Sequence, residues 1–313
     1  RIHDRMVYMM NLEEVSECQK PGLLSAFHRL CAFDPKYGQF PGSLPVSLSR
    51  KDLHYICKNN SYSVCEKTDG VRYMMLITSG DMYIVDRLMN FHKVYSGVTF
   101  DRDCVYDGEL VISNDGSCWY YMVFDVFASR GRTVKDVTNH KARIENVSKT
   151  LPRRLHTGSF NLVINVKTFY YVNNFVKCSE LTQSLPYATD GYIFTPTRRK
   201  IFNGTDRRTY KWKDVYDHTI DFDLQNDGFL YLWDKNDQKT RVSRLVCDEG
   251  DVFSTPCIVE CKLIKNDNDV TSWKFVKERV DKNRPNSMMT YLSTIQVIEE
   301  GITLQDLNNL SKY

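Results

Sequence analysis

Two β-hairpin patterns in the first half of the chain constrain the fold most strongly. Apolar and polar residues alternate over residues 71–86 on both sides of Ser79-Gly80, a dipeptide typical of a tight turn between antiparallel strands. The second pattern has arms over residues 104–112 and 118–127, rich in Val, Ile, Tyr and Phe, and its turn is Asn114-Asp115-Gly116. These two patterns predict antiparallel sheet in this half of the chain.

The second hairpin carries carboxylates on both arms. Asp107-Gly108-Glu109 interrupts the first arm, and Asp125 follows Val123-Phe124 in the second. Burying an unpaired carboxylate among apolar strand residues costs free energy. We therefore expect a cationic partner, a metal ion or a sheet face that opens on a cleft.

A pentapeptide between two strand patterns, Glu66-Lys67-Thr68-Asp69-Gly70, contains a candidate nucleophile. A lysine held between rigid flanking strands can act as an amine nucleophile. Gly70 lets the backbone turn tightly and approach a phosphate closely. A lysine, an acid and a glycine at this spacing also arise by chance in about one chain of this length in ten. Taken alone, the segment is therefore better explained as an exposed turn.

The composition is that of an ordinary soluble globular chain, and its length is enough for one large domain plus a small one. It has 313 residues, of which 42% are hydrophobic and 26% are charged. The net charge of +3 excludes a polybasic tail but allows a local basic groove. The ten cysteines follow no repeating pair spacing, so we expect reduced thiols of an intracellular protein. No apolar run is long enough for a membrane span, and we expect no membrane contact.

The remaining patterns predict helices and a second domain. The expected helices cover residues 1–33, 136–151, 179–185, 288–298 and 303–310, the last with Thr303 as its N-cap. Further strands are expected over residues 162–167 and 189–196, and Tyr210-Lys211-Trp212-Lys213 alternates so that both lysines share one face of a strand. We place the domain boundary at residues 214–218. Five short strand patterns then fit a small OB-type barrel, over residues 219–223, 228–233, 240–245, 257–264 and 272–277.

Six short motifs, taken in order, resemble those of the covalent nucleotidyltransferases, which include ATP-dependent DNA ligases, RNA ligases and mRNA capping guanylyltransferases. The matching segments are Lys67-Thr68-Asp69-Gly70, Asp107-Gly108-Glu109-Leu110, Val123-Phe124-Asp125, Asp190-Gly191-Tyr192-Ile193-Phe194, Lys211-Trp212-Lys213, and Trp273 followed by Arg279-Val280-Asp281-Lys282. Each motif alone is a weak signal, whereas six in the order of the superfamily are a strong one. The resemblance covers residues 40–310.

Three features resemble the capping guanylyltransferases more than the ligases. Phe40-Pro41-Gly42 with Pro45-Val46-Ser47 resembles a signature ahead of the nucleophile, and the Lys-Trp-Lys triplet at 211–213 has the capping form. His218-Thr219-Ile220-Asp221-Phe222 resembles the entry into the OB domain of these enzymes. One position departs from the pattern, because Lys277 stands where many capping enzymes have arginine. A lysine keeps the charge but loses the bidentate fork, which leaves a phosphate role for Lys277 open.

The resemblance implies an α+β fold with two domains. A nucleotidyltransferase domain of antiparallel sheets with flanking helices is expected over residues 1–215. A C-terminal OB-fold β-barrel domain is expected over residues 216–302, and a final helix over about residues 303–313 can pack back on the first domain.

The activity implied by the resemblance is that of an mRNA guanylyltransferase. The lysine nucleophile takes GMP from GTP as a covalent phosphoramidate and passes it to the 5′-diphosphate end of RNA, which forms the GpppN cap. Mg²⁺ or Mn²⁺ is the implied cofactor. The implied partners are the RNA polymerase II C-terminal tail, an RNA triphosphatase and a cap methyltransferase. The implied location is the nucleus for a cellular source, and the cytoplasm or a virus factory for a viral one.

The resemblance also implies a role for each site residue. Lys67 is the nucleophile, and Glu109 and Asp190 hold the metal, because hard carboxylate oxygens suit these ions. The implied nucleotide-binding residues are Thr68, Arg72, Arg87, Phe124, Lys167, Lys211, Lys213, Arg279, Asp281 and Lys282. In this set, Phe124 stacks on guanine and Lys167 donates to guanine O6, with a surface lysine at a strand end as the alternative for Lys167. The last three residues of the set meet the β- and γ-phosphates when the two domains close.

Two other functions stay open at this point. An ATP-dependent polynucleotide ligase of the same superfamily would share the fold and use a different base. A non-catalytic module that binds RNA ends would share the fold without the chemistry, although the presence of Lys67 argues against it. Labelling of the protein by GTP or by ATP separates the three.

Overall fold

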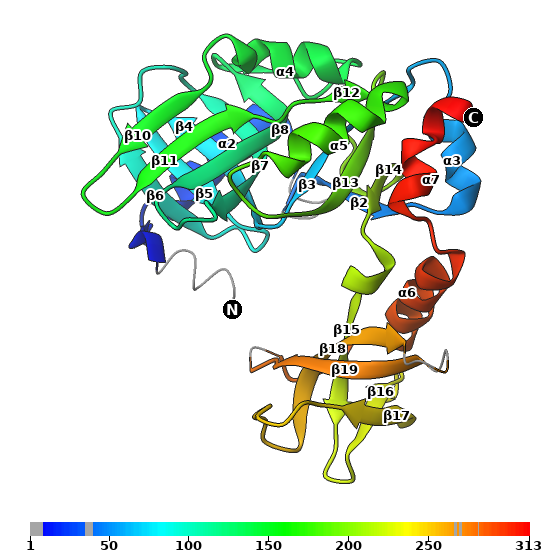
Figure 1. Ribbon diagram of the computed structural model, residues 1–313. Helices are drawn as coiled ribbons and strands as arrows, with labels where there is room; N and C mark the ends of the chain where they lie inside the picture. The colour runs from blue at the N-terminus through cyan, green and yellow to red at the C-terminus, as the bar shows by residue number, and fades with distance from the viewer. Residues whose placement is uncertain (1–8, 35–39, 266–267, 269–270, 281) are drawn as a thin grey trace. The chain divides into compact units, whose positions relative to one another are not determined.

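The computed structural model describes residues 9–34, 40–265, 268, 271–280 and 282–313, and the chain divides into two units (Figure 1). The first unit comprises residues 1–47, 52–212 and 308–313, and the second comprises residues 48–51 and 213–307. The main division therefore falls between Trp212 and Lys213.

The larger sheet of the first unit has nine strands. Their order is β1 (Glu13–Glu14), β6 (Phe91–Ser96), β5 (Asp81–Val85), β4 (Val71–Thr78), β7 (Cys104–Ile112), β8 (Trp119–Ser129), β11 (Asn161–Val166) and β10 (Arg153–His156), with β9 (Arg132–Thr133) paired to β8. Both predicted hairpins are confirmed, since β4 pairs antiparallel with β5 and β7 pairs antiparallel with β8. The sheet as a whole is mixed, because β8 and β11 run parallel. A parallel pair needs a crossover connection, and the segment between these strands supplies it.

The second sheet of this unit has five strands and carries the pentapeptide. Its order is β12 (Tyr170–Tyr171), β3 (Tyr62–Thr68), β13 (Thr189–Pro196), β14 (Gly204–Trp212) and β2 (Ser43–Ser47). The chain leaves β3 of this sheet at Thr68 and enters β4 of the larger sheet at Val71. A Cβ on Gly70 would lie 2.3 Å from the carbonyl oxygen of Leu110, so only glycine fits this crossing. Within the pentapeptide only Asp69 is exposed, which rules out the alternative of an ordinary exposed turn.

Helices flank the two sheets. They are α2 (Lys20–Cys31), α3 (Arg50–Ile56), α4 (His140–Ser148) and α5 (Phe175–Gln183), with short 3₁₀ turns at Val172–Asn174 and Leu310–Lys312. α7 (Leu304–Asn308) belongs to the second unit except for its last residue. α2 has a proline in its first turn and buries Phe27, Leu30 and Cys31 against the larger sheet. The helix expected over residues 1–33 is thus confirmed in its second half. Glu13–Glu14 instead pair with β6, and residues 1–8 lie outside the described part of the chain.

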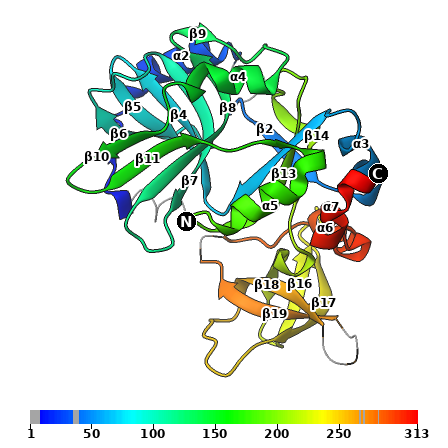
Figure 2. The ribbon, with the colours of Figure 1, turned by 45° about the horizontal axis from the view of Figure 1, so that its top comes forward.

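The second unit contains a closed five-stranded barrel (Figure 2). Its order is β15 (Thr219–Leu224), β16 (Phe229–Trp233), β17 (Lys239–Val246), β19 (Thr271–Glu278) and β18 (Cys257–Lys265), which confirms all five predicted strands to within two residues. Phe222 and Trp273 pack edge to face in its core, with ring centroids 5.1 Å apart. Ser287 caps α6 (Met288–Glu300), and the predicted N-cap Thr303 accepts a hydrogen bond from the Asp306 backbone at 3.1 Å.

Two further expectations concern the state of the cysteines and the presence of a membrane-spanning helix. All ten cysteines are free thiols. Cys257 and Cys261 lie in β18, where Cys261 is buried in the barrel core. Across the described ranges, no helix has the length and apolar character that a membrane crossing requires.

Candidate active site

Lys67 lies at the end of β3 and forms an ion pair with Asp190 at the start of β13. Lys67 Nζ donates to Asp190 Oδ1 at 2.7 Å, and the two side chains are 22% and 17% exposed. β3 and β13 pair antiparallel, with Thr68 opposite Thr189, and the register shifts at the next residues of β13. This irregularity lies at Asp190 and Gly191, where Gly191 has a φ of 136° that favours glycine. The sheet thus brings the first and fourth motifs into contact.

Glu109 lies on β7, directly opposite Arg72 of β4 in the larger sheet. Its side chain is half-buried, and loss of hydration raises the pKa of the carboxyl above its ordinary value. The positive charges of Lys167, Lys67 and Arg72 act in the opposite direction. Glu109 therefore stands in the electrostatic field of the nucleophile and of two other predicted site residues.

Arg72 has a structural partner that the sequence did not identify. Its Nε and Nη2 donate to the two carboxylate oxygens of Asp107 at 2.9 and 2.6 Å, and Nη1 donates to the Ser43 carbonyl at 2.6 Å. Both side chains are buried, and desolvation raises the pKa of Asp107 despite the neighbouring guanidinium. Asp125 likewise accepts two hydrogen bonds from Arg143, at 2.8 and 3.1 Å. The cationic partners expected for Asp107 and Asp125 are therefore present.

Two cations lie near the ring of Phe124, which belongs to β8. The Arg72 guanidinium is 5.2 Å and the Lys167 ammonium 5.5 Å from the centre of its ring. Phe40 continues the stack on the Arg72 side, at 5.1 Å from the guanidinium. The half-buried Phe124 ring is thus held in place by its neighbours.

Lys167 directly follows β11 and is buried, with 5% of its surface exposed. Its Nζ donates to the Glu66 carbonyl at 3.1 Å and lies 3.5 Å from the Glu66 carboxylate. Burial alone would lower the pKa of Lys167, but the negative charge of Glu66, with a smaller contribution from Glu109, raises it above the ordinary value. The alternative that Lys167 is a surface lysine at a strand end is therefore wrong.

Glu66 is a site residue that the sequence analysis missed. Besides Lys167, its carboxylate accepts hydrogen bonds from the Thr68 hydroxyl at 2.8 Å and from the Tyr187 hydroxyl at 2.9 Å. The residue is buried and directly precedes Lys67. The signal was available, because Glu66 interrupts a strand pattern just as Asp107 does. Thr68 is buried beside it, and its hydroxyl oxygen keeps the capacity to accept a hydrogen bond.

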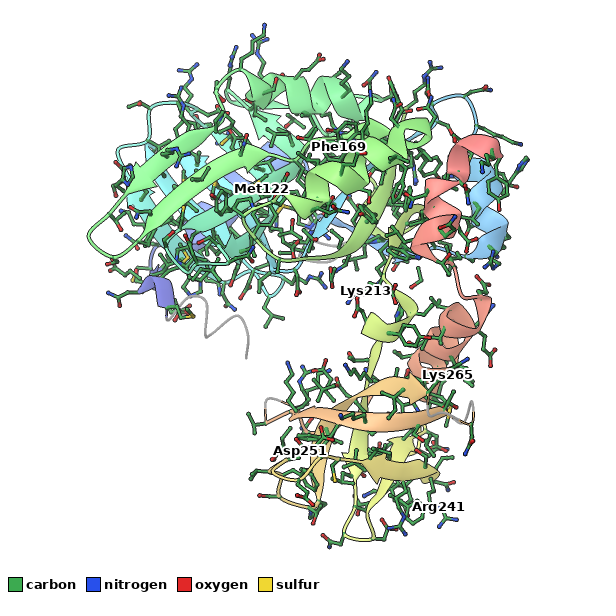
Figure 3. All side chains as sticks on the ribbon, in the orientation of Figure 1. Met122, Phe169, Lys213, Arg241, Asp251 and Lys265 are labelled. Atoms are coloured by element: carbon green, nitrogen blue, oxygen red, sulfur yellow. The ribbon has the colours of Figure 1, made fainter. Side chains whose placement is uncertain are left out.

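Three more predicted residues have different placements. Arg87 follows β5 and is exposed. Reduced hydration and the positive charge of Arg72 lower the pKa of Arg87, whereas the negative charge of Glu109 raises it. Arg87 therefore interacts electrostatically with two other predicted site residues. Lys211 lies on β14, opposite Ile193 of the strand that carries Asp190. β14 ends at Trp212, so Lys213 lies beyond the strand and in the second unit (Figure 3). The expectation that both lysines share one strand face is therefore not met.

Predicted phosphate ligands of the second unit gather around two acids. Arg279 Nη1 lies 3.1 Å from both carboxylate oxygens of Asp221 and 3.5 Å from Glu260, and Lys282 also pairs with Asp221. Lys277 Nζ lies 3.2 Å from Glu260. Asp221 is buried, which makes these pairs part of the barrel structure. Asp281 lies outside the described residues.

Glu109 and Asp190 were predicted to hold a divalent metal. Among the described residues, no group of three or more His, Cys, Asp or Glu side chains is placed to hold a metal ion. Mg²⁺ is commonly held by one or two carboxylates together with water and substrate phosphates. Asp190 contacts the nucleophile and Glu109 lies in its field, so two carboxylates in this position fit that donor chemistry.

Comparisons with known proteins cover almost the whole chain. Residues 7–215 match the family described as mRNA capping enzyme, catalytic domain, and residues 202–308 match mRNA capping enzyme, C-terminal domain. The mRNA-capping enzyme subunit alpha of Schizosaccharomyces pombe is 30% identical over 86% of this chain and 79% of its own length. The mRNA-capping enzyme of Caenorhabditis elegans is 28% identical over 92% of this chain, which spans 51% of that protein. A solved mycobacterial DNA ligase D complexed with ATP and MES is 12% identical with a TM-score of 0.47, over 78% of this chain and 96% of that one, a likeness too slight to bear on function.

Proposed function

The chain belongs to the mRNA capping enzyme family, and from this premise we propose that it is an mRNA guanylyltransferase with Lys67 as its nucleophile. GTP is the nucleotide substrate, and the 5′-diphosphate end of RNA is the acceptor. The observation that supports this most directly is the contact of Lys67 with Asp190 at 2.7 Å, inside the cluster formed by the family's motifs. A lysine held by one carboxylate at the end of a rigid strand has the positioning that an amine nucleophile needs.

The first step forms a phosphoramidate. The lone pair of Lys67 Nζ attacks the α-phosphorus of GTP, the bond from that phosphorus to the bridging oxygen breaks, and pyrophosphate leaves with the electron pair. The amine must be neutral to attack; its nitrogen becomes positively charged as the bond to phosphorus forms and then releases one proton. Asp190, at 2.7 Å, is placed to accept that proton.

A divalent cation bound at Glu109 and Asp190 would neutralise negative charge on the phosphates. Lys67 Nζ is engaged by Asp190 at 2.7 Å, and only a neutral amine with a free lone pair is nucleophilic. A cation held by the Asp190 carboxylate would also compete with Lys67 for that carboxylate and so release the amine for attack. The requirement for Mg²⁺ or Mn²⁺ is thus part of the proposal.

The second step transfers GMP to RNA. An oxygen of the terminal β-phosphate attacks the α-phosphorus of lysyl-GMP, the phosphorus–nitrogen bond breaks, and Lys67 recovers its electron pair and a proton. The product is the GpppN cap. The other partners follow only from the family: an RNA triphosphatase that prepares the diphosphate end, a cap methyltransferase, and the RNA polymerase II C-terminal tail.

Guanine selection is assigned to Phe124 and Lys167. The ring of Phe124 offers a stacking face, and Lys167 Nζ has donors left after its hydrogen bond to the Glu66 carbonyl. Guanine presents an acceptor, O6, where adenine presents an amino group, so a donor at this point favours GTP. Arg279 and Lys282 are proposed to exchange Asp221 for the β- and γ-phosphates during the first step.

The test is covalent labelling with nucleotides radiolabelled at the α-phosphate. GTP with Mg²⁺ should leave label on the protein after denaturing electrophoresis, and ATP should not. RNA with a 5′-diphosphate should discharge the label, and RNA with a 5′-monophosphate should not. Labelling by ATP in place of GTP would indicate a ligase, and a folded protein labelled by neither would indicate a binding module.

A further inference from the structure

The outer face of β16 carries a row of aromatic rings. Leu230 and Leu232 point into the barrel and are fully buried, so the three residues of β16 that alternate with them face outward. These are Phe229, Tyr231 and Trp233, each half-buried, and they recur about every 6.8 Å along the strand. Aromatic rings in such a row on an outer face do not contribute to the barrel core.

The neighbouring strand β17 places a basic residue opposite every ring. The directly paired residues are Phe229 with Arg244, Tyr231 with Arg241, and Trp233 with Lys239. We call these six residues the aromatic–basic ladder. Aromatic–cation pairs across strands stabilise a hairpin by themselves, so the pairing alone does not indicate a ligand.

Two arginines at one end of the ladder share one aromatic ring. The guanidinium groups of Arg241 and Arg244 lie 4.6 and 4.7 Å from the centre of the single Phe229 ring. Neither forms an ion pair with any residue that the structure describes. The carboxylate of Asp227, which accepts the hydrogen bond of the Tyr231 hydroxyl at 2.6 Å, offsets part of the charge of Arg241 without forming an ion pair with it. Two like charges gathered on one ring repel each other, and a bound anion would relieve that repulsion.

The other end of the ladder provides an internal contrast. Lys239 and Arg284 lie 5.3 and 5.0 Å from the Trp233 ring, but each is paired with an acid. Lys239 lies 3.0 Å from Asp223, and Arg284 pairs with Asp237. Within the part of the chain that the structure describes, the ladder charges without an ion pair are therefore those of Arg241, which Figure 3 labels on β17, and Arg244.

We propose that the aromatic–basic ladder binds single-stranded RNA, with phosphates at Arg241 and Arg244 and bases stacked on the rings and guanidinium planes. Bases stack on aromatic rings and on arginine with little regard to sequence, and phosphates supply the missing negative charge. The outer face of the second and third strands is also where OB-type barrels bind oligonucleotides. The choice of RNA over other polyanions rests on the proposed function, whereas the anionic, stackable ligand follows from the ladder itself.

The test measures binding of the full chain to a single-stranded oligoribonucleotide with a 3′ fluorophore, by fluorescence anisotropy at several salt concentrations and without GTP. The double variant Arg241→Gln, Arg244→Gln loses two phosphate contacts, so the slope of log affinity against log salt should fall by about 1.4. Phe229→Leu keeps an apolar side chain without a stacking face, and it should lower affinity by about 5-fold to about 150-fold.

The matched control is Lys262→Gln, Lys265→Gln, which changes the net charge by the same amount on exposed residues of β18 (Figure 3 labels Lys265). It should keep the wild-type salt slope. Equal losses in the control and ladder variants, wild-type binding by the ladder variants, or no RNA binding by the wild type would each overturn the proposal. Displacement of the RNA by poly-glutamate, with Phe229→Leu binding normally, would instead indicate an acidic protein partner. Since the assay contains no GTP, failure of GMP transfer leaves its outcome unaffected.

Discussion

Replacing Lys167 by methionine should destabilise the first unit, because it removes one partner of a buried ion pair. Methionine keeps the length of the side chain and loses the charge. Glu66 then remains buried without the ammonium group 3.5 Å away, and its backbone carbonyl loses a donor at 3.1 Å. Breaking a buried pair in this way costs about 3–5 kcal/mol. Because Thr68 and Tyr187 still donate to Glu66, we expect the lower end, about 3 kcal/mol.

The pH dependence of this loss has a definite sign. Glu66 holds the pKa of Lys167 above its ordinary value of 10.5. A raised pKa in the folded state stabilises the protein fully below the unfolded pKa, and the contribution disappears as pH rises through the folded value. The difference in unfolding free energy between wild type and Lys167→Met should therefore stay constant from about pH 6 to about pH 9.

Urea unfolding of four proteins tests this reasoning. Lys167→Met should lose about 3 kcal/mol, and adding Glu66→Gln should recover part of that loss because the isolated charge is gone. Lys177→Met, an exposed lysine on α5, is the control and should stay within about 0.5 kcal/mol of wild type. If Lys167→Met also stays within that range, the buried pair and the base contact built on it are refuted. In the double variant, discrimination between GTP and ATP should fall by about 5-fold to about 150-fold.

Three further predictions concern other parts of the account. Gly70→Ala places a Cβ 2.3 Å from a carbonyl oxygen of β7 and should lower the unfolding free energy by about 1–3 kcal/mol in urea, whereas Gly158→Ala, with nothing within 4 Å, should not. The pKa of Glu109 is raised, so its ionisation destabilises the folded state once pH rises above the ordinary value of 4.5. Glu109→Gln should therefore raise the melting temperature at neutral pH but not below about pH 4. The same substitution should slow GMP transfer. Arg279→Ala and Lys282→Ala should slow formation of lysyl-GMP far more than its discharge to RNA, because only GTP carries the phosphates they are proposed to hold; single-turnover rates that fall equally in both steps would contradict that role.

Local patterns in the sequence predicted most of the elements. The hairpins at Ser79-Gly80 and at residues 114–116 and the five barrel strands depend on alternation and on turn residues, which are short-range properties. The strand at Glu13–Glu14 was missed because its two residues show no pattern of their own and form a strand only by pairing with β6. Parallel pairing of β8 with β11 likewise depends on contacts between distant segments.

The sequence identified individual residues of the candidate site but not the contacts between them. Motif order identified Lys67 and Asp190, but their contact depends on the register of β3 against β13, which no local pattern specifies. The burial of Lys167 beside Glu66 could not be seen either, since the two residues are separated by about a hundred positions. The pairing of Arg279 with Asp221 has the same origin, because it joins the two ends of the barrel sequence.

The central claim is that GMP is carried on the side chain of Lys67. Its most direct test is mass spectrometry of the protein after incubation with GTP and Mg²⁺, followed by digestion and sequencing of the modified peptide. The account predicts the mass of one GMP on the peptide that contains Lys67, attached to that lysine, and no adduct on Lys67→Ala under the same conditions. An adduct on Lys211, Lys167 or any other residue, or one retained by Lys67→Ala, would contradict it.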